Sequence, residues 1–233
     1  MKYIVSLLIF LSAFSLNAQI ELNQLNYGGG GKYTDLMAVI NPSNIKGSPL
    51  GFDEWRKGRF VVVGGDTSTY FLINYHTEKD QLYLKKIGTE EIFETNEDLI
   101  EVLLLENFEG EVETFVKVDW HSFKRFPDYS KYCQQLIMKE NFQLIKYRDK
   151  VLERPDMKQD SYSGPKIEEY VLKERYFWRN SDKQPYEEIS LSRSSLKLIF
   201  SETQEERMKQ YLKKNRVKWN RETEVLQMLE AIL

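Results

Sequence analysis

Apolar and polar side chains alternate along most of the chain between residues 61 and 178, and this period of two is typical of β-strands. Alternating or densely apolar segments lie at 69–75, 80–88, 90–95, 99–108, 111–119, 131–139, 142–152, 167–179 and 186–190. Turn-forming residues separate several of them, such as Gly64-Gly65-Asp66, Gly88-Thr89, Gly110 and Glu140-Asn141. Because strands with short links between them pair as hairpins, we expect a mainly antiparallel sheet.

The period changes to that of a helix after residue 190. A short helix is expected after Ser192, and a second should begin at Ser201, which has capping-box spacing to Gln204, and end at Asn215. A last helix should begin near Asn220, with one apolar face formed by Val225, Met228, Leu229 and Ile232. The pattern predicts an α+β fold in which an antiparallel sheet body at about 58–190 is followed by C-terminal helices that pack on it.

The first 18 residues have the layout of a secretory signal peptide. Lys2 supplies the positive charge, residues 3–16 are uncharged and largely apolar, and Ala18 precedes the expected cut. The apolar run is shorter than the roughly 20 residues that span a bilayer, so cleavage is favoured over a membrane anchor. We expect a signal peptide at 1–18, a flexible segment at 19–45 and one α+β domain at 46–233. A division of that domain into two subdomains near 124–130 stays open. The mature protein should be soluble and periplasmic, cell-surface or secreted.

Charge and cysteine content narrow the classes of protein. The chain has 33 basic and 36 acidic residues, and loss of Lys2 with the signal peptide leaves a formal charge of 32 − 36 = −4. This interspersed, mildly acidic balance argues against a nucleic-acid partner. The lone cysteine, Cys133, cannot form an internal disulfide and lies among aromatic and aliphatic residues. We interpret it as a small buried apolar residue rather than a reactive thiol, because no neighbouring base would lower its pKa.

Catalytic and cofactor motifs are scarce. His76 and His121 are far apart in the sequence and form no metal-ligand spacing, so no metal site is predicted. Gly28 to Gly31 and Lys32 miss the spacing of a phosphate loop, and no cofactor is expected. Adjacent acids such as Glu187-Glu188 are plentiful. A glycosidase requires two carboxylates that face each other across a cleft. A secreted hydrolase acting on glycans or peptides therefore stays as the alternative.

The segment from Asn44 to Gly65 holds the candidate binding residues. Trp55 stands among charged neighbours, and we select Trp55, Arg56 and Arg59 as a binding site if they face solvent together. The other interpretation is a structural corner, in which the turn residues only set up the strand that follows and Trp55 folds onto the sheet edge.

This segment and the two strand candidates that follow it carry a resemblance. Its matching positions are Gly47, Ser48, Pro49, Trp55, Gly58, Asn74, Tyr75, Leu82 and Leu84. With these residues and its closing helices, the chain resembles a group of uncharacterised exported proteins of Bacteroidota, although the order Asn74-Tyr75 is reversed relative to that group. The resemblance implies an envelope or secreted protein and brings no activity or catalytic residue with it. We therefore expect a non-enzymatic binding or structural module of the cell envelope, whose partner is an envelope or extracellular protein or a glycan.

Overall fold

The computed structural model describes residues 45–95, 97–124, 131–154 and 168–233. The expected signal peptide lies outside the described residues, and so does the N-terminal segment up to residue 44. Most of the candidate sub-boundary near 124–130 lies outside them too. The strands on either side of it nevertheless belong to one sheet, because Val118 pairs directly with Lys131.

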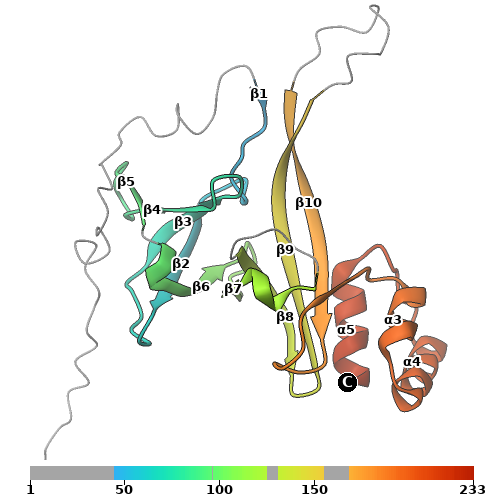
Figure 1. Ribbon diagram of the computed structural model, residues 1–233. Coiled ribbons are helices and arrows are strands. Elements are labelled where there is room, and N and C mark those ends of the chain that lie inside the picture. The colour runs from blue at the N-terminus through green and yellow to red at the C-terminus, as the bar shows by residue number, and fades with distance from the viewer. Residues whose placement is uncertain (1–44, 96, 125–130, 155–167) are drawn as a thin grey trace, which may run out of the picture.

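Eleven strands of the described chain form one sheet (Figure 1). In chain order they are β1 (Ile45–Lys46), β2 (Arg56–Val62), β3 (Phe71–His76), β4 (Gln81–Lys85), β5 (Ile92–Glu94), β6 (Ile100–Glu106), β7 (Val112–Val118), β8 (Lys131–Lys139), β9 (Phe142–Glu153), β10 (Glu168–Arg179) and β11 (Glu187–Ile189). Their order in space is β1-β10-β9-β8-β7-β6-β2-β3-β4-β5, and β11 pairs with β10. The β1–β10 pair is parallel, and the other pairs of these strands are antiparallel.

The expected turns lie where the sequence placed them. Gly88 and Gly110 have φ angles of 82° and 83°, a left-handed conformation that glycine adopts without a steric penalty. Lys139 pairs with Phe142 across Glu140-Asn141, so a two-residue loop joins β8 to β9. Short 3-10 helices, η1 (Glu97–Leu99) and η2 (Trp120–Ser122), occupy two of the other links.

Apolar clusters cover both faces of the central strands. Tyr132 belongs to a cluster with Phe60 and Leu105, whereas its neighbour Cys133 belongs to another with Phe177. Successive residues of a strand point to opposite faces, so these two clusters lie on opposite sides of the sheet. This double coverage explains why the strand segments in the sequence are apolar on both faces.

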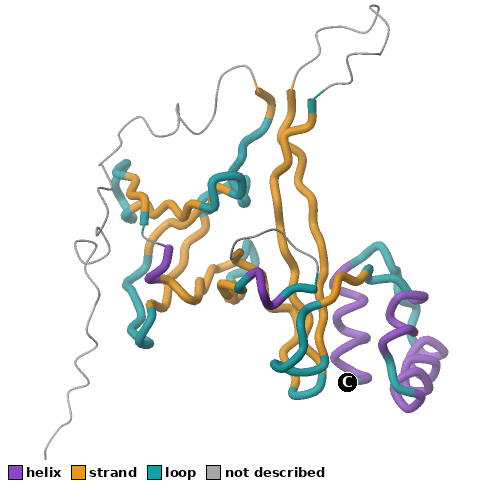
Figure 2. The backbone as a smooth tube through the Cα atoms, in the orientation of Figure 1, coloured by secondary structure: helices purple, strands orange, loops and turns teal. Residues whose placement is uncertain are grey.

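Three helices follow the sheet: α3 (Arg193–Ile199), α4 (Glu202–Lys214) and α5 (Glu222–Ile232). They lie together beside one end of the β9–β10 hairpin (Figures 1 and 2). Ser201 and Gln204 form the expected capping box, and Asn215 ends α4 as predicted. The expected apolar face of α5 is fully buried against β8 and β9. The predicted α+β class is therefore confirmed.

An ionic contact fixes the first turn of α5 to the sheet. Glu222 accepts hydrogen bonds from Lys146 Nζ at 2.8 Å and from the Tyr176 hydroxyl at 2.6 Å. Burial and this carboxylate raise the pKa of Tyr176, which keeps the hydroxyl protonated as a donor.

No described helix is long and apolar enough to cross a bilayer.

Candidate functional site

Arg56, one of the three selected binding residues, is an internal cross-link of the sheet. Its Nη1 contacts Glu113 Oε2 at 2.7 Å, and its Nε and Nη2 donate to the carbonyls of Glu106 at 2.9 Å and Leu105 at 3.2 Å. The guanidinium also lies 5.1 Å from the ring centre of Phe52. The arginine therefore joins β2 to β6 and β7, and each of its three nitrogens already donates a hydrogen bond within the protein.

Arg59 lies on the face of β2 opposite to Arg56, because odd and even residues of a strand point to opposite sides, and Trp55 lies just ahead of the strand. Arg59 lies over the ring of Tyr70, with 5.0 Å between Cζ and the ring centre, and Lys57 stacks on the same ring at 4.6 Å. Trp55 is half-buried against the cluster of Leu50, Tyr83 and Ile92. The structure thus does not bring Trp55, Arg56 and Arg59 together into one surface.

The turn-rich segment ahead of β2 forms a corner held by Asn74. The Asn74 amide donates to Phe52 O at 2.8 Å, and its carbonyl accepts from Phe52 N–H at 3.2 Å and from Tyr75 N–H at 2.8 Å. The backbone continues this contact, since Gly51 N–H donates to Tyr75 O at 2.7 Å. The segment ahead of β2 runs along β3 at this point, and the Asn74 side chain bonds the backbone of Phe52 as a neighbouring strand would. This geometry supports the corner interpretation of the segment.

Neither histidine is placed for metal binding in the described part of the chain. His76 is buried at the end of β3, where its Nδ1 accepts from Lys79 N–H at 3.2 Å and burial lowers its pKa to about 4. His121 is exposed, with its Nδ1 2.8 Å from Asp119 Oδ1. Within the described ranges, no three His, Cys, Asp or Glu side chains lie close enough to hold an ion. Cys133 is buried as predicted, and burial raises the pKa of its thiol.

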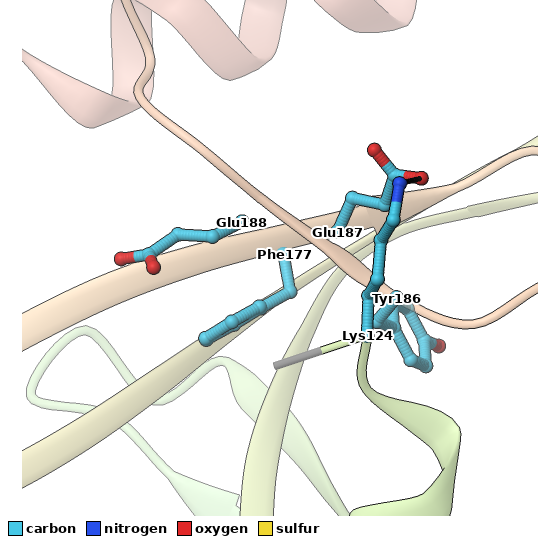
Figure 3. A pocket seen from close by; sticks show the side chains of 5 residues that line it. All are labelled: Lys124, Phe177, Tyr186, Glu187 and Glu188. Carbon is cyan, nitrogen blue, oxygen red and sulfur yellow. Dashed lines mark hydrogen bonds and ion pairs between the residues drawn. The ribbon is translucent and has the colours of Figure 1, made fainter. Parts of the chain in front are cut away.

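A cavity of about 310 Å³ is lined by the Glu187-Glu188 pair. Its carboxylates can be compared with the facing pair that a glycosidase requires. Figure 3 shows the two carboxylates directed apart, as expected for neighbours on one strand. Glu187 contacts Lys124 Nζ at 2.9 Å, and Glu188 accepts two hydrogen bonds from Arg175, at 2.8 and 2.6 Å. Those bonds lower the pKa of Glu188, which is the reverse of what a general acid requires. The cavity lacks the arrangement of a glycosidase.

The larger hollow is an open groove of about 720 Å³ beside the β6–β7 turn. We call it the acidic groove. It is formed by the turn at 107–111, the start of β7, the second half of β8 and the first turns of α5. Its lining residues are Asn107, Phe108, Glu109, Glu111, Val112, Glu113, Thr114, Gln134, Gln135, Leu136, Met138, Glu222, Thr223 and Leu226.

Large apolar side chains of the acidic groove face solvent. Phe108 is 90 % exposed, Val112 59 % and Met138 45 %. Single exposed apolar residues are common, but three on one concave surface mark an interaction site more often than chance. The β6–β7 turn that carries Phe108 is well fixed, because Asn107 Oδ1 accepts from the backbone N–H groups of Glu109 and Glu111, both at 2.9 Å.

The groove is also negatively charged. Among the described residues that line it, four are glutamates and none is basic. Glu113 is paired with Arg56 and Glu222 with Lys146, so two of the four charges are compensated from behind the groove. Within the described residues, Glu109 and Glu111 form no ion pair with a basic side chain, which leaves a net charge of −4 + 2 = −2 at the turn.

The acidic groove was not among the sites expected from the sequence. Its residues belong to four segments up to 119 positions apart (226 − 107), and each looked like an ordinary strand, turn or helix face. One local signal was present: Phe108 stands in a turn with Gly110 and several acids, and such turns run over the protein surface. Comparison of the chain with protein-family models, with curated proteins and with solved structures finds no match.

Proposed function

We propose that the protein is an exported, non-enzymatic binding module of a bacterial cell envelope, and that it binds a protein partner in the acidic groove. The observation that carries the proposal is the set of exposed apolar side chains Phe108, Val112 and Met138 on one concave surface. Export and the envelope setting rest on the N-terminal sequence and on the resemblance to exported proteins of Bacteroidota.

A protein partner fits this surface better than a glycan. Carbohydrate sites present flat aromatic platforms together with polar groups, whereas the aliphatic Val112 and Met138 contribute much of the exposed apolar side-chain surface here. Aromatic and methionine side chains with a polar rim are typical of protein interfaces. The groove is also open, so it suits a segment of another chain laid along it.

Site-specific photo-crosslinking tests the proposal in cells of the source organism. A benzophenone amino acid replaces Phe108 in one strain and Leu198 in a control strain. Leu198 is a matched control because it is 87 % exposed and lies on α3, outside the residues that line the groove. We expect a discrete crosslinked protein from position 108 and none from position 198. Equal crosslinking at both positions, or none at position 108, would refute the proposal.

A further inference from the structure

The acidic groove opens where two neighbouring strands separate. β7 pairs with β6 from Val112 to Val116, but its register with β8 begins only at Phe115, opposite Gln134. Beyond that point β8 pairs with β9 alone, and its register shifts between Gln135 and Ile137. Among the described strands, β7 therefore has a partner on one side only at 112–114.

Backbone groups of this edge point into the groove. Asn107 N–H donates to Glu111 O at 2.8 Å, which makes Glu111 a hydrogen-bonded residue of the β6–β7 hairpin. Hydrogen-bonded and non-hydrogen-bonded positions alternate in an antiparallel pair, so Glu113 bonds to β6 in the same way. The N–H and C=O groups of Val112 and Thr114 consequently point away from β6, toward the space between β7 and β8.

Side chains along the edge alternate in chemistry. Glu111 and Glu113 lie on one face of the sheet, and Val112 and Thr114 lie on the other. Residues directly opposite each other in adjacent strands share a face, and opposite charges there stabilise the pair. A strand beside this edge would therefore place a basic side chain opposite Glu111, because Glu113 is already paired with Arg56, and apolar side chains beside Val112.

We propose that the partner supplies an extended segment with alternating basic and apolar residues, which joins the sheet as an added strand at the edge of β7. The inference rests on the proposed function, because it specifies what the acidic groove binds. Edge addition uses backbone hydrogen bonds for affinity and the alternate side chains for specificity. The net charge of −2 at the turn attracts the basic side chains of the segment, and the exposed Val112 contacts its apolar side chains.

The affinities of seven-residue peptides with blocked termini for the wild-type protein test the inference. The first peptide alternates lysine and valine, and a control peptide has glutamate in place of each lysine. Two further peptides carry N-methyl groups on all valines or on all lysines, which removes the N–H donors from one side of the strand at a time. We expect the lysine peptide to bind at least tenfold more tightly than the glutamate peptide, and only one N-methylated peptide to lose at least tenfold in affinity.

A protein variant locates the binding. Thr114→Pro removes an N–H that faces the groove and leaves the β6 pairing intact, so we expect the lysine–valine peptide to lose at least tenfold in affinity. Thermal unfolding checks that the variant folds, and the N-methylated peptides decide the question on wild-type protein if it does not.

Three results would overturn the inference. Equal affinities of the two N-methylated peptides would show that no strand is added. Failure of the lysine peptide to bind, while position 108 still crosslinks a partner, would refute the basic segment and leave the proposed function standing. A dimer that Thr114→Pro dissociates would show that a second copy of this chain occupies the edge instead. Peptide binding with the expected N-methyl dependence, but no crosslink at position 108, would support the site and refute the cellular function.

Discussion

Replacing Asn74 by alanine should loosen the corner ahead of β2. The amide of Asn74 is 1 % exposed and satisfies both backbone groups of Phe52, at 3.2 and 2.8 Å. Removing it leaves a buried N–H and a buried C=O without these partners. Each unsatisfied group costs about 1–3 kcal/mol, so we expect the free energy of unfolding to fall by about 2–6 kcal/mol for the two groups.

Urea unfolding of the mature protein measures this loss, and hydrogen exchange locates it. Amide protons that depend on the corner, such as that of Gly51, should exchange faster in Asn74→Ala, whereas those of α5 should change only through the global loss of stability. Asn74→Asp separates the two roles, since it keeps an acceptor for Phe52 N–H but loses the donor to Phe52 O at neutral pH. A loss below about 1 kcal/mol in Asn74→Ala would refute the reasoning, because it would be smaller than one unsatisfied group costs.

Three further outcomes are expected. Gly58→Ala should reduce the free energy of unfolding by about 1–3 kcal/mol, because an added Cβ would lie 2.5 Å from Leu104 O and 2.6 Å from Leu105 Cδ2; urea unfolding equal to wild type would contradict the close strand contact. The pKa of His76 is lowered to about 4 in the folded state, below its ordinary value of 6.5, so the unfolded chain binds more protons between these values and stability should fall as pH drops through this window, by about 1–2 kcal/mol from pH 7 to 5. His76→Asn should remove that part of the pH dependence, and the exposed His121→Asn should keep it. Cys133 should react with a thiol reagent only in urea, because it is fully buried, and rapid labelling of the folded protein would contradict its position.

The sequence predicted the fold class and most elements because both depend on local signals. Alternation fixed the strands, the capping residues Ser201 and Gln204 fixed the start of α4, and the spacing of Val225 to Ile232 fixed the buried face of α5. These signals involve residues within a few positions of one another, so one sequence contains them in full.

The candidate sites were harder to predict because they depend on pairing between distant strands. Adjacent residues Trp55 and Arg56 seemed to offer one surface, but Trp55 lies ahead of β2 against a separate apolar cluster, and Glu113 binds the arginine from a strand 57 residues away. The acidic groove arises where β7 and β8 part, after only four registered pairs. Neither strand's own pattern encodes that separation, because β7 stays regularly paired with β6, and β8 stays paired with β9 across its register shift.

The parallel pair of β1 and β10 makes completion of the sheet depend on a segment that is synthesised long after β1. Ile45 pairs with Glu168, a separation of 168 − 45 = 123 residues, whereas the pairing of β2 with β6 spans 47 residues from Gly58 to Leu105. Most strands can therefore find partners while the chain is still growing, but β1 must wait for β10, and contacts of such long range slow folding. A chain truncated before residue 168 would leave the long edge of β9 exposed and would lack all three helices. A chain that lacks β10 would therefore present an open strand edge to proteases and chaperones.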